Sequence, residues 1–251
     1  MSAVVRVGTA QAPDGALLAF RVEGEGGRAL AACNGIGISS FWRALAAHFA
    51  RRGDTFLTWD YRGQGASPPA AHPESTTVAS CARDLWSVLD AVPVGRAVLL
   101  AHSLGAHVIV EAWRQKPERV LALVPMAGPV RFPAALRPLL RVLVEVGAAN
   151  AEAAARALRA LLALPGATEA LAALGALPAQ ENGDRESSLR RLAALDLRGW
   201  FSLARDLLSR DTTRLFSEVR APVLQLDAPL AGQPELIALK LEKFLETVES
   251  P

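Results

Sequence analysis

The amino-acid sequence predicts an α/β protein in which a mostly parallel sheet is covered by helices on both faces. After an opening hairpin, short apolar runs alternate with stretches of helical periodicity, which is the pattern of a parallel sheet. Residues 130–216 break this alternation, because they are rich in Ala, Leu and Arg, have helical periodicity and show no strand pattern. We therefore expect residues 1–129 and 217–251 to form the core, with residues 130–216 inserted as a helical cap. The C-terminal part of this core is unusually short.

The individual elements follow from apolar spacing and from turn residues. Two strands, Val4–Val7 and Leu17–Val22, flank Pro13-Asp14-Gly15, which predicts a hairpin. Further strands are expected at residues 29–33, 56–59, 97–101, 120–125 and 221–226. Helices are expected at residues 42–51, 75–91, 104–115 and 235–248, together with about four in the cap, whose apolar spacing is helical.

Composition limits the possible roles. Of the 251 residues, 51% are hydrophobic and 21% are charged, so the chain can bury a substantial core. The formal net charge is +2, and arginines and acids are interspersed, which gives no reason to expect nucleic-acid binding. The apolar runs are too short to predict a signal peptide or a membrane span. Cys33 and Cys81 fall in regular elements, and we expect them to be buried thiols of a cytoplasmic protein.

Ser103 lies between a buried strand and a helix. The strand over residues 97–101 runs into the serine, and a helix begins directly after it. This arrangement predicts a nucleophile elbow, in which the serine occupies a sharp strand-to-helix turn with its hydroxyl exposed. Ala101 and Gly105 supply the small side chains that such a turn needs on either side of the serine. Ser103 is therefore the candidate nucleophile.

Four segments, in this order, resemble the α/β-hydrolase family, and in particular its small capped esterase- and lipase-like members. They are Asn34-Gly35-Ile36-Gly37, Asp60-Tyr61-Arg62-Gly63-Gln64-Gly65-Ala66-Ser67, Ala101-His102-Ser103-Leu104-Gly105 and Pro117-Glu118-Arg119-Val120-Leu121-Ala122-Leu123-Val124. The resemblance is strong over residues 1–129, extends to the cap only in character, and covers residues 218–251 in fragments. It implies an α/β-hydrolase fold and acyl-ester hydrolysis through an acyl-enzyme on Ser103.

The resemblance also implies an oxyanion hole made of two backbone N–H groups. One is that of Leu104, directly after the serine at a helix N-terminus. The other is that of Ile36, in a glycine turn that can bend its N–H groups toward the serine, although an ordinary connecting turn is the alternative. Asp60 and Arg62 lie at a strand end, and the resemblance implies a structural role for their turn.

The general base of a serine hydrolase is missing from its expected place. A nucleophilic serine needs a histidine to accept its proton, and in the resembled family that histidine comes last in the chain. The four histidines are His48, His72, His102 and His107. We expect His48 and His72 at the surface or in helix packing. We expect the ring of His102 to project away from the serine hydroxyl and His107 to lie on the following helix, one turn beyond the serine, so neither is expected to be the base.

The stretch before the last helix is too short for the missing part. Twelve residues lie between Pro222 and Glu235, whereas a strand–helix–strand crossover takes about 30. Residues 221–226 resemble the acid-bearing strand of the family, and residues 224–232 equally resemble the later strand that leads to the histidine. An internal deletion that fused the two strands accounts for both, and leaves Asp227 as the candidate acid. A deletion of this kind exposes a sheet edge, so we expect a less stable protein than intact relatives.

Two functions are consistent with these residues. The first is hydrolysis of a small or medium hydrophobic carboxylic ester through Ser103, impaired because the histidine is missing. The second is a non-catalytic member of the family that binds a ligand in the pocket corresponding to the family's active site. A serine at the elbow disfavours dehalogenase and epoxide-hydrolase chemistry. The histidines and cysteines lack metal-ligand spacing, so we expect neither a metal nor a cofactor.

Overall fold

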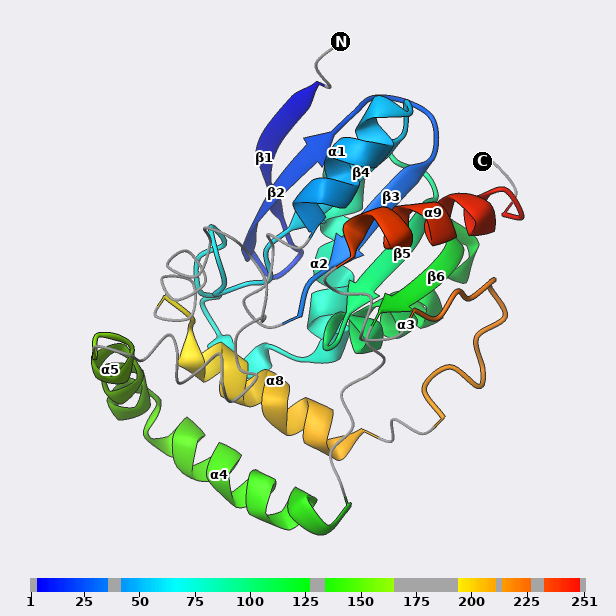
Figure 1. Ribbon diagram of the computed structural model, residues 1–251. Helices are drawn as coiled ribbons and strands as arrows, with labels where there is room; N and C mark the ends of the chain where they lie inside the picture. Colours follow the sequence, from blue (N-terminus) through cyan, green and yellow to red (C-terminus); the bar gives the residue numbers. More distant parts are fainter. Residues whose placement is uncertain are drawn as a thin grey trace.

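The core of the protein is one six-stranded sheet in the order β1-β2-β4-β3-β5-β6. The computed structural model describes residues 4–35, 42–126, 134–164, 194–210, 214–226 and 233–248. Figure 1 shows the sheet with helices on both of its faces. The strands are β1 (Val5–Gln11), β2 (Leu17–Glu23), β3 (Ala29–Cys33), β4 (Thr55–Trp59), β5 (Ala97–His102) and β6 (Val120–Met126).

The first two strands form the predicted hairpin, and the remaining pairings are as expected for a mostly parallel sheet. β1 pairs with β2, and β2 with β4, in antiparallel directions. β3 pairs in parallel with both β4 and β5, and β5 pairs in parallel with β6. The carboxyl ends of β3, β4, β5 and β6 therefore meet at one edge of the sheet, where ligand sites of α/β proteins form.

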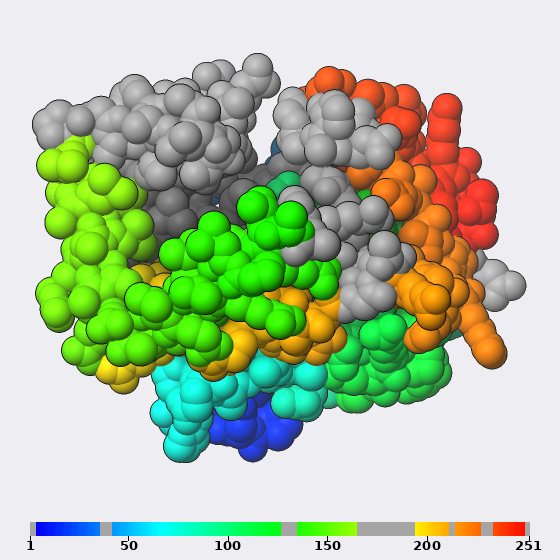
Figure 2. Space-filling view, turned by 90° about the horizontal axis from the view of Figure 1, so that it is seen from below, coloured from blue at the N-terminus to red at the C-terminus, as the bar shows by residue number. Residues whose placement is uncertain are grey.

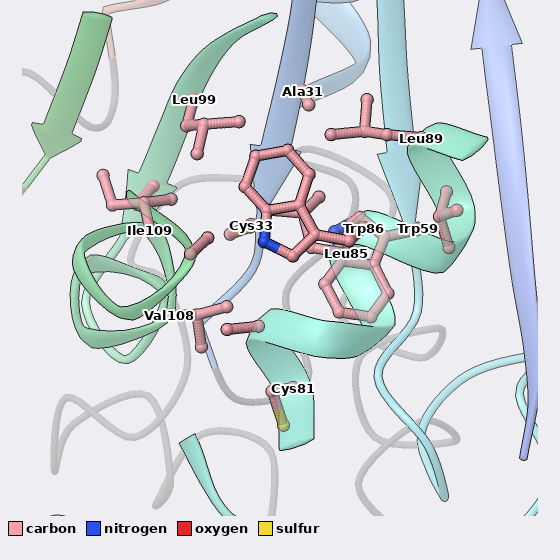
Figure 3. Close-up of a cluster of buried hydrophobic side chains, with 14 of the residues drawn as sticks. Ala31, Cys33, Trp59, Cys81, Leu85, Trp86, Leu89, Leu99, Val108 and Ile109 are labelled. Atoms are coloured by element: carbon pink, nitrogen blue, oxygen red, sulfur yellow. The ribbon is translucent and has the colours of Figure 1, made fainter. Parts of the chain in front are cut away.

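Two layers of helix bury the sheet. On one face, α1 (Arg43–Arg51) and α9 (Pro234–Leu245) cover a cluster that includes Phe56 and Leu241. On the other face, α2 (Val78–Ala91) and α3 (Gly105–Gln115) pack on a larger cluster. Figure 3 shows part of this second cluster, in which side chains of the strands interlock with those of α2 and α3. Cys33 and Cys81 lie in it as free, buried thiols, as predicted.

Helix α2 begins later than the sequence indicated. The expected start was residue 75, but Pro73–Ser75 form a separate 3₁₀ turn and α2 begins at Val78. The reason is the cap at Thr77, whose side chain accepts a hydrogen bond from the Ser80 N–H while Ser80 Oγ accepts one from the Thr77 N–H. This capping box determines the helix start. Among the described helices, none is long and apolar enough to cross a membrane.

The segment expected to be a helical cap contains α4 (Arg137–Ala149), α5 (Ala151–Leu162) and α8 (Leu197–Ser209), and residues 165–193 lie outside the described residues. α8 lies against the core. Asp206 Oδ2 accepts a hydrogen bond of 2.7 Å from the Val78 N–H, and Ser202 Oγ donates one of 2.5 Å to the Glu74 carbonyl. α4 and α5 lie outside α8 and form much of the surface seen in Figure 2.

The chain returns to the sheet at residues 222–226, which run parallel to the outer side of β6. The Leu224 N–H donates to the Leu123 carbonyl at 3.0 Å, and the Leu226 N–H donates to the Pro125 carbonyl at 3.0 Å. The predicted strand is thus present only as two isolated bridges, at Val223 and Leu226. Pro222 contributes to this irregularity, because proline has no N–H to donate to a ladder.

Candidate active site

Ser103 occupies the sharp turn between β5 and α3. Its φ is 51°, and among the described residues it is the one non-glycine residue with positive φ. The Ser103 N–H donates to the Met126 carbonyl at the end of β6, at 3.2 Å, and the Ser103 carbonyl accepts from the Ala106 N–H at 3.0 Å. A left-handed conformation costs a residue with a Cβ about 1 to 2 kcal/mol. Strain of this kind is typical of functional positions, and the turn has the backbone geometry of a nucleophile elbow.

Gly105 allows α3 to begin in contact with β3. A Cβ at this position would lie 2.4 Å from the Cys33 carbonyl oxygen and 3.0 Å from the Asn34 carbonyl oxygen. Both atoms belong to the backbone and cannot move aside cheaply. Ala101, on the other side of the serine, is fully buried, so its methyl group is accommodated at the position where the elbow needs a small side chain.

Of the two residues predicted to form the oxyanion hole, Leu104 and Ile36, the structure describes Leu104. Leu104 is the N-cap of α3 and is buried. Its N–H donates to no group in the part of the chain that the structure describes, so it is available to an oxyanion at the helix N-terminus. Ile36 lies outside the described residues. Gly35, directly before it, packs on the elbow: a Cβ on Gly35 would lie 3.6 Å from Ser103 Cβ.

Asn34 holds the start of that turn in place. It is buried, its Nδ2 donates to the Trp59 carbonyl at 2.9 Å, and its Oδ1 accepts from Trp42 Nε1 at 2.6 Å. The Asn34 carbonyl accepts from the Tyr61 hydroxyl at 3.1 Å. No role was predicted for Asn34 from the sequence. The sequence shows only an asparagine directly before a glycine turn. Its hydrogen-bond partners are distant in the sequence, so spacing does not indicate them.

The turn after β4 has a structural role, as the resemblance implied. Arg62 is almost fully buried, and its guanidinium donates to Asp84 at 2.8 and 2.5 Å and to Asp14 at 2.7 and 3.3 Å. This hydrogen bonding lowers the pKa of Asp14. Asp60 Oδ2 accepts a hydrogen bond from the Ala66 N–H within the same turn. Arg62 and Asp84 thus tie the turn to α2, a pairing that was not predicted from the sequence.

The four histidines are dispersed. His48, on α1, makes a 2.6 Å contact with Glu242 on α9, and His72 is a largely exposed partner of Glu74. His107 is buried within α3. His102 precedes the serine and packs on the glycine turn, because a Cβ on Gly35 would lie 2.8 Å from its Nδ1. Burial lowers the pKa of His102, which favours the neutral ring.

The predicted acid, Asp227, lies outside the described residues. The residue before it, Leu226, forms a parallel bridge with Met126, and Met126 pairs with His102 of β5. Leu226 is therefore at the same level of the sheet as the elbow, separated from it by β6. Nothing in the described residues tests the role of Asp227 itself.

Comparison with known proteins identifies the family. A sequence profile described as the alpha/beta hydrolase fold matches residues 29–163, just over half of the chain. The chain belongs to this family. RutD of Azorhizobium caulinodans, a candidate carbamate hydrolase, is 32% identical over 137 residues, which are 55% of this chain and 51% of that protein. RutD of Variovorax paradoxus is 34% identical over 99 residues, 39% of this chain and 37% of that protein. The matched region thus spans about half or less of the length of these relatives.

Solved structures extend the likeness to the whole chain. Epoxide hydrolase A from Mycobacterium thermoresistibile has a TM-score of 0.73 at 17% identity and covers 99% of this chain and 100% of its own. The enol-lactonase from Burkholderia xenovorans has a TM-score of 0.69 at 16% identity, covering 95% of this chain and 100% of its own. At these identities the likeness establishes the α/β-hydrolase fold, and the chemistry has to be argued from the residues.

Proposed function

We propose that this α/β-hydrolase carries a serine esterase site, in which Ser103 is acylated by a small or medium hydrophobic carboxylic ester. The observation that supports this most is the strained serine at the elbow, with its φ of 51°. A non-glycine residue keeps such a conformation only where the surrounding structure imposes it, and here it places a hydroxyl at the carboxyl edge of the sheet.

The proposed reaction has two steps. Ser103 Oγ attacks the ester carbonyl carbon and its proton passes to solvent; the C–O bond to the alcohol then breaks, the alkoxide takes a proton from solvent, and an acyl-enzyme remains. Water then attacks the acyl carbonyl and loses a proton to solvent; the bond to Ser103 Oγ breaks, the carboxylic acid departs, and Ser103 takes up a proton from solvent. In both steps the N–H groups of Leu104 and Ile36 donate to the developing oxyanion. The uncommitted Leu104 N–H and the contact of Gly35 with the elbow support this assignment.

The proposed site has an acid for the proton transfers but no histidine to act as the base. Asp227 is the proposed acid, supported by the bridge that brings Leu226 level with the elbow. No histidine follows His107 in the 251 residues, so a base from the C-terminal part of the chain is missing. In serine hydrolases, loss of the histidine alone costs about 10⁶ in turnover. The oxyanion hole and substrate binding leave about 10³ to 10⁴ over water. We therefore propose slow acylation and slow release.

A hydrophobic substrate is favoured by the helical segment, which we propose to be the cap of the site. On α4, four apolar side chains at helical spacing are more than half exposed among the described residues: Leu139, Val142, Leu143 and Val146. An apolar cap suits an apolar acyl group.

The second candidate function is ligand binding without turnover, and the missing C-terminal histidine favours it. Prolonged labelling with a fluorophosphonate separates the two, because a serine held beside an oxyanion hole reacts with this probe slowly but selectively even without its histidine. The esterase proposal predicts one added phosphonyl group on the intact chain, mapped to Ser103 and absent in Ser103→Ala. If the wild-type chain stays unlabelled, or labels equally in Ser103→Ala, the esterase proposal is wrong and the binding function takes its place.

A further inference from the structure

The buried side-chain amide of Asn34 links the end of β3 to the start of α1. Asn34 follows β3, and Trp42 immediately precedes α1. The 2.6 Å hydrogen bond from Trp42 Nε1 to Asn34 Oδ1 therefore ties the residue that follows β3 to the residue that precedes α1. Both side chains are buried, and Trp42 also packs against Phe56 of β4, with ring centroids 6.4 Å apart.

Two more hydrogen bonds fix the same residue to the end of β4. Asn34 Nδ2 donates to the Trp59 carbonyl at 2.9 Å, and the Asn34 carbonyl accepts from the Tyr61 hydroxyl at 3.1 Å. Two of these three bonds involve the Asn34 side chain and one involves its backbone carbonyl. Together they hold the backbone of Asn34 between the start of α1 and the end of β4.

Gly35 transmits this position to the elbow. It is bonded to Asn34 on one side and packs against His102 and Ser103 on the other. The amide that follows Gly35 in the chain is the Ile36 N–H, which the proposed function places in the oxyanion hole. A displacement of about 1 Å in such a group can reduce a rate about 100-fold.

We propose that Asn34 and Trp42 are positioning residues, whose hydrogen bond holds Gly35 against the elbow and thereby sets the reactivity of Ser103. This inference rests on the proposed function. It adds a specific consequence: the indole N–H of Trp42, which touches neither the serine nor the substrate, controls the rate at which Ser103 is acylated.

The test compares two tryptophan-to-phenylalanine changes. Trp42→Phe removes the N–H that binds Asn34. Trp86→Phe makes the same change in a buried residue whose Nε1 has no hydrogen-bond partner among the described residues. The measurement is the saturation kinetics of phosphonylation, in which Ser103 Oγ bonds to phosphorus, fluoride leaves, the serine proton passes to solvent and the phosphoryl oxygen takes the place of the oxyanion.

We expect Trp42→Phe to lower the limiting rate of phosphonylation at least about tenfold. Loss of a whole oxyanion donor costs about 10² to 10³, and this variant displaces one. The half-saturating probe concentration stays unchanged, and Trp86→Phe leaves the rate at the wild-type value. Tyr61→Phe, which removes a single oxygen, is expected to lower the same rate and serves if Trp42→Phe does not fold. Equal effects of the two tryptophan variants, or none in either, overturn the positioning role while leaving the esterase proposal intact. A wild-type chain that is not labelled overturns both.

Discussion

The two parts of the chain on either side of β6 differ in how regularly they are built. Before β6, the structure holds the strained serine, Gly35 packed on the elbow and the buried Arg62–Asp84 pair. After β6, residues 222–226 form only two bridges to the sheet, and the next described element is α9. The first part holds Ser103, the proposed nucleophile, whereas the second part packs against the sheet and, by sequence, contains no histidine.

This difference separates apolar burial from the chemistry that we propose for Ser103. α9 buries Ile237, Leu241 and Leu245 against the face of the sheet that α1 also covers. Apolar burial is non-directional and does not require a fixed arrangement of polar groups. Catalysis instead depends on a few polar groups in a fixed arrangement, so the proposed deletion would remove the base and leave the fold in place.

The largest effect on stability is expected from disrupting the buried ion pair between Arg62 and Asp84, which lies in the first part. Asp84→Asn leaves the buried guanidinium of Arg62 without one of its two carboxylates and should lower the free energy of unfolding by about 3 kcal/mol. Asp90→Asn, which affects an exposed ion pair with Arg119, should lower it by about 1 kcal/mol or less. Urea unfolding of the two variants measures the contrast, and equal losses would show that the turn does not depend on its buried pair.

A comparable or smaller loss in the free energy of unfolding is expected from a truncation in the last helix. This variant tests whether α9 packs in the core. Leu241→Ala removes a fully buried side chain of α9 and should cost about 2 to 4 kcal/mol. Leu239→Ala, on the same helix, truncates a half-exposed side chain and should cost far less. If Leu241→Ala behaves like Leu239→Ala in urea unfolding, α9 is not packed as described.

The strain at the elbow predicts a difference between two variants that both lack the hydroxyl. Ser103→Gly should be more stable than Ser103→Ala by about 1 kcal/mol, because glycine adopts positive φ without the steric cost that a Cβ imposes. Thermal unfolding of both proteins measures the difference. An alanine variant as stable as the glycine variant would mean that the turn is not strained.

The smallest effect concerns the contact between α1 and α9. The hydrogen bond from His48 and the nearby Arg52 lower the pKa of Glu242 from its usual 4.5. A carboxylate whose pKa is lower in the folded state adds stability above its unfolded pKa, and loses it as pH falls through the folded pKa. The difference in stability between wild type and Glu242→Gln should therefore be present at pH 6 and should shrink below about pH 4.5. A difference independent of pH would exclude this contribution.

The sequence predicted most of the first part because its signals are local. Apolar runs and turn residues placed β3 at residues 29–33 as observed, and the residues around Ser103 predicted the sharp turn at the end of β5. The start of α2 was predicted three residues early, because the capping box at Thr77 competes with the apolar periodicity. The pairing of Arg62 with Asp84 and the bonds of Asn34 join residues that are 8 to 27 positions apart, and spacing does not reveal them.

The second part was harder to predict for a physical reason. Residues 221–226 fitted two different strands of the family, since a short apolar run contains no information on its neighbour in the sheet. The structure places them beside β6, in the position of the next strand. The roles of Asp227 and Ile36 stay predictions, because both residues lie outside the described part of the chain.

The most direct test of the central claim, a nucleophile that lacks its base, is chemical rescue. Hydrolysis of p-nitrophenyl butyrate is followed with and without added imidazole, for the wild-type chain and for Ser103→Ala. Because imidazole also cleaves the ester in solution, the rate with Ser103→Ala at each imidazole concentration is subtracted. We predict slow hydrolysis by the wild type that rises with neutral imidazole and depends on Ser103. Rapid hydrolysis without imidazole would contradict the claim by revealing a substitute base, and rates identical to Ser103→Ala throughout would show that Ser103 is not a nucleophile.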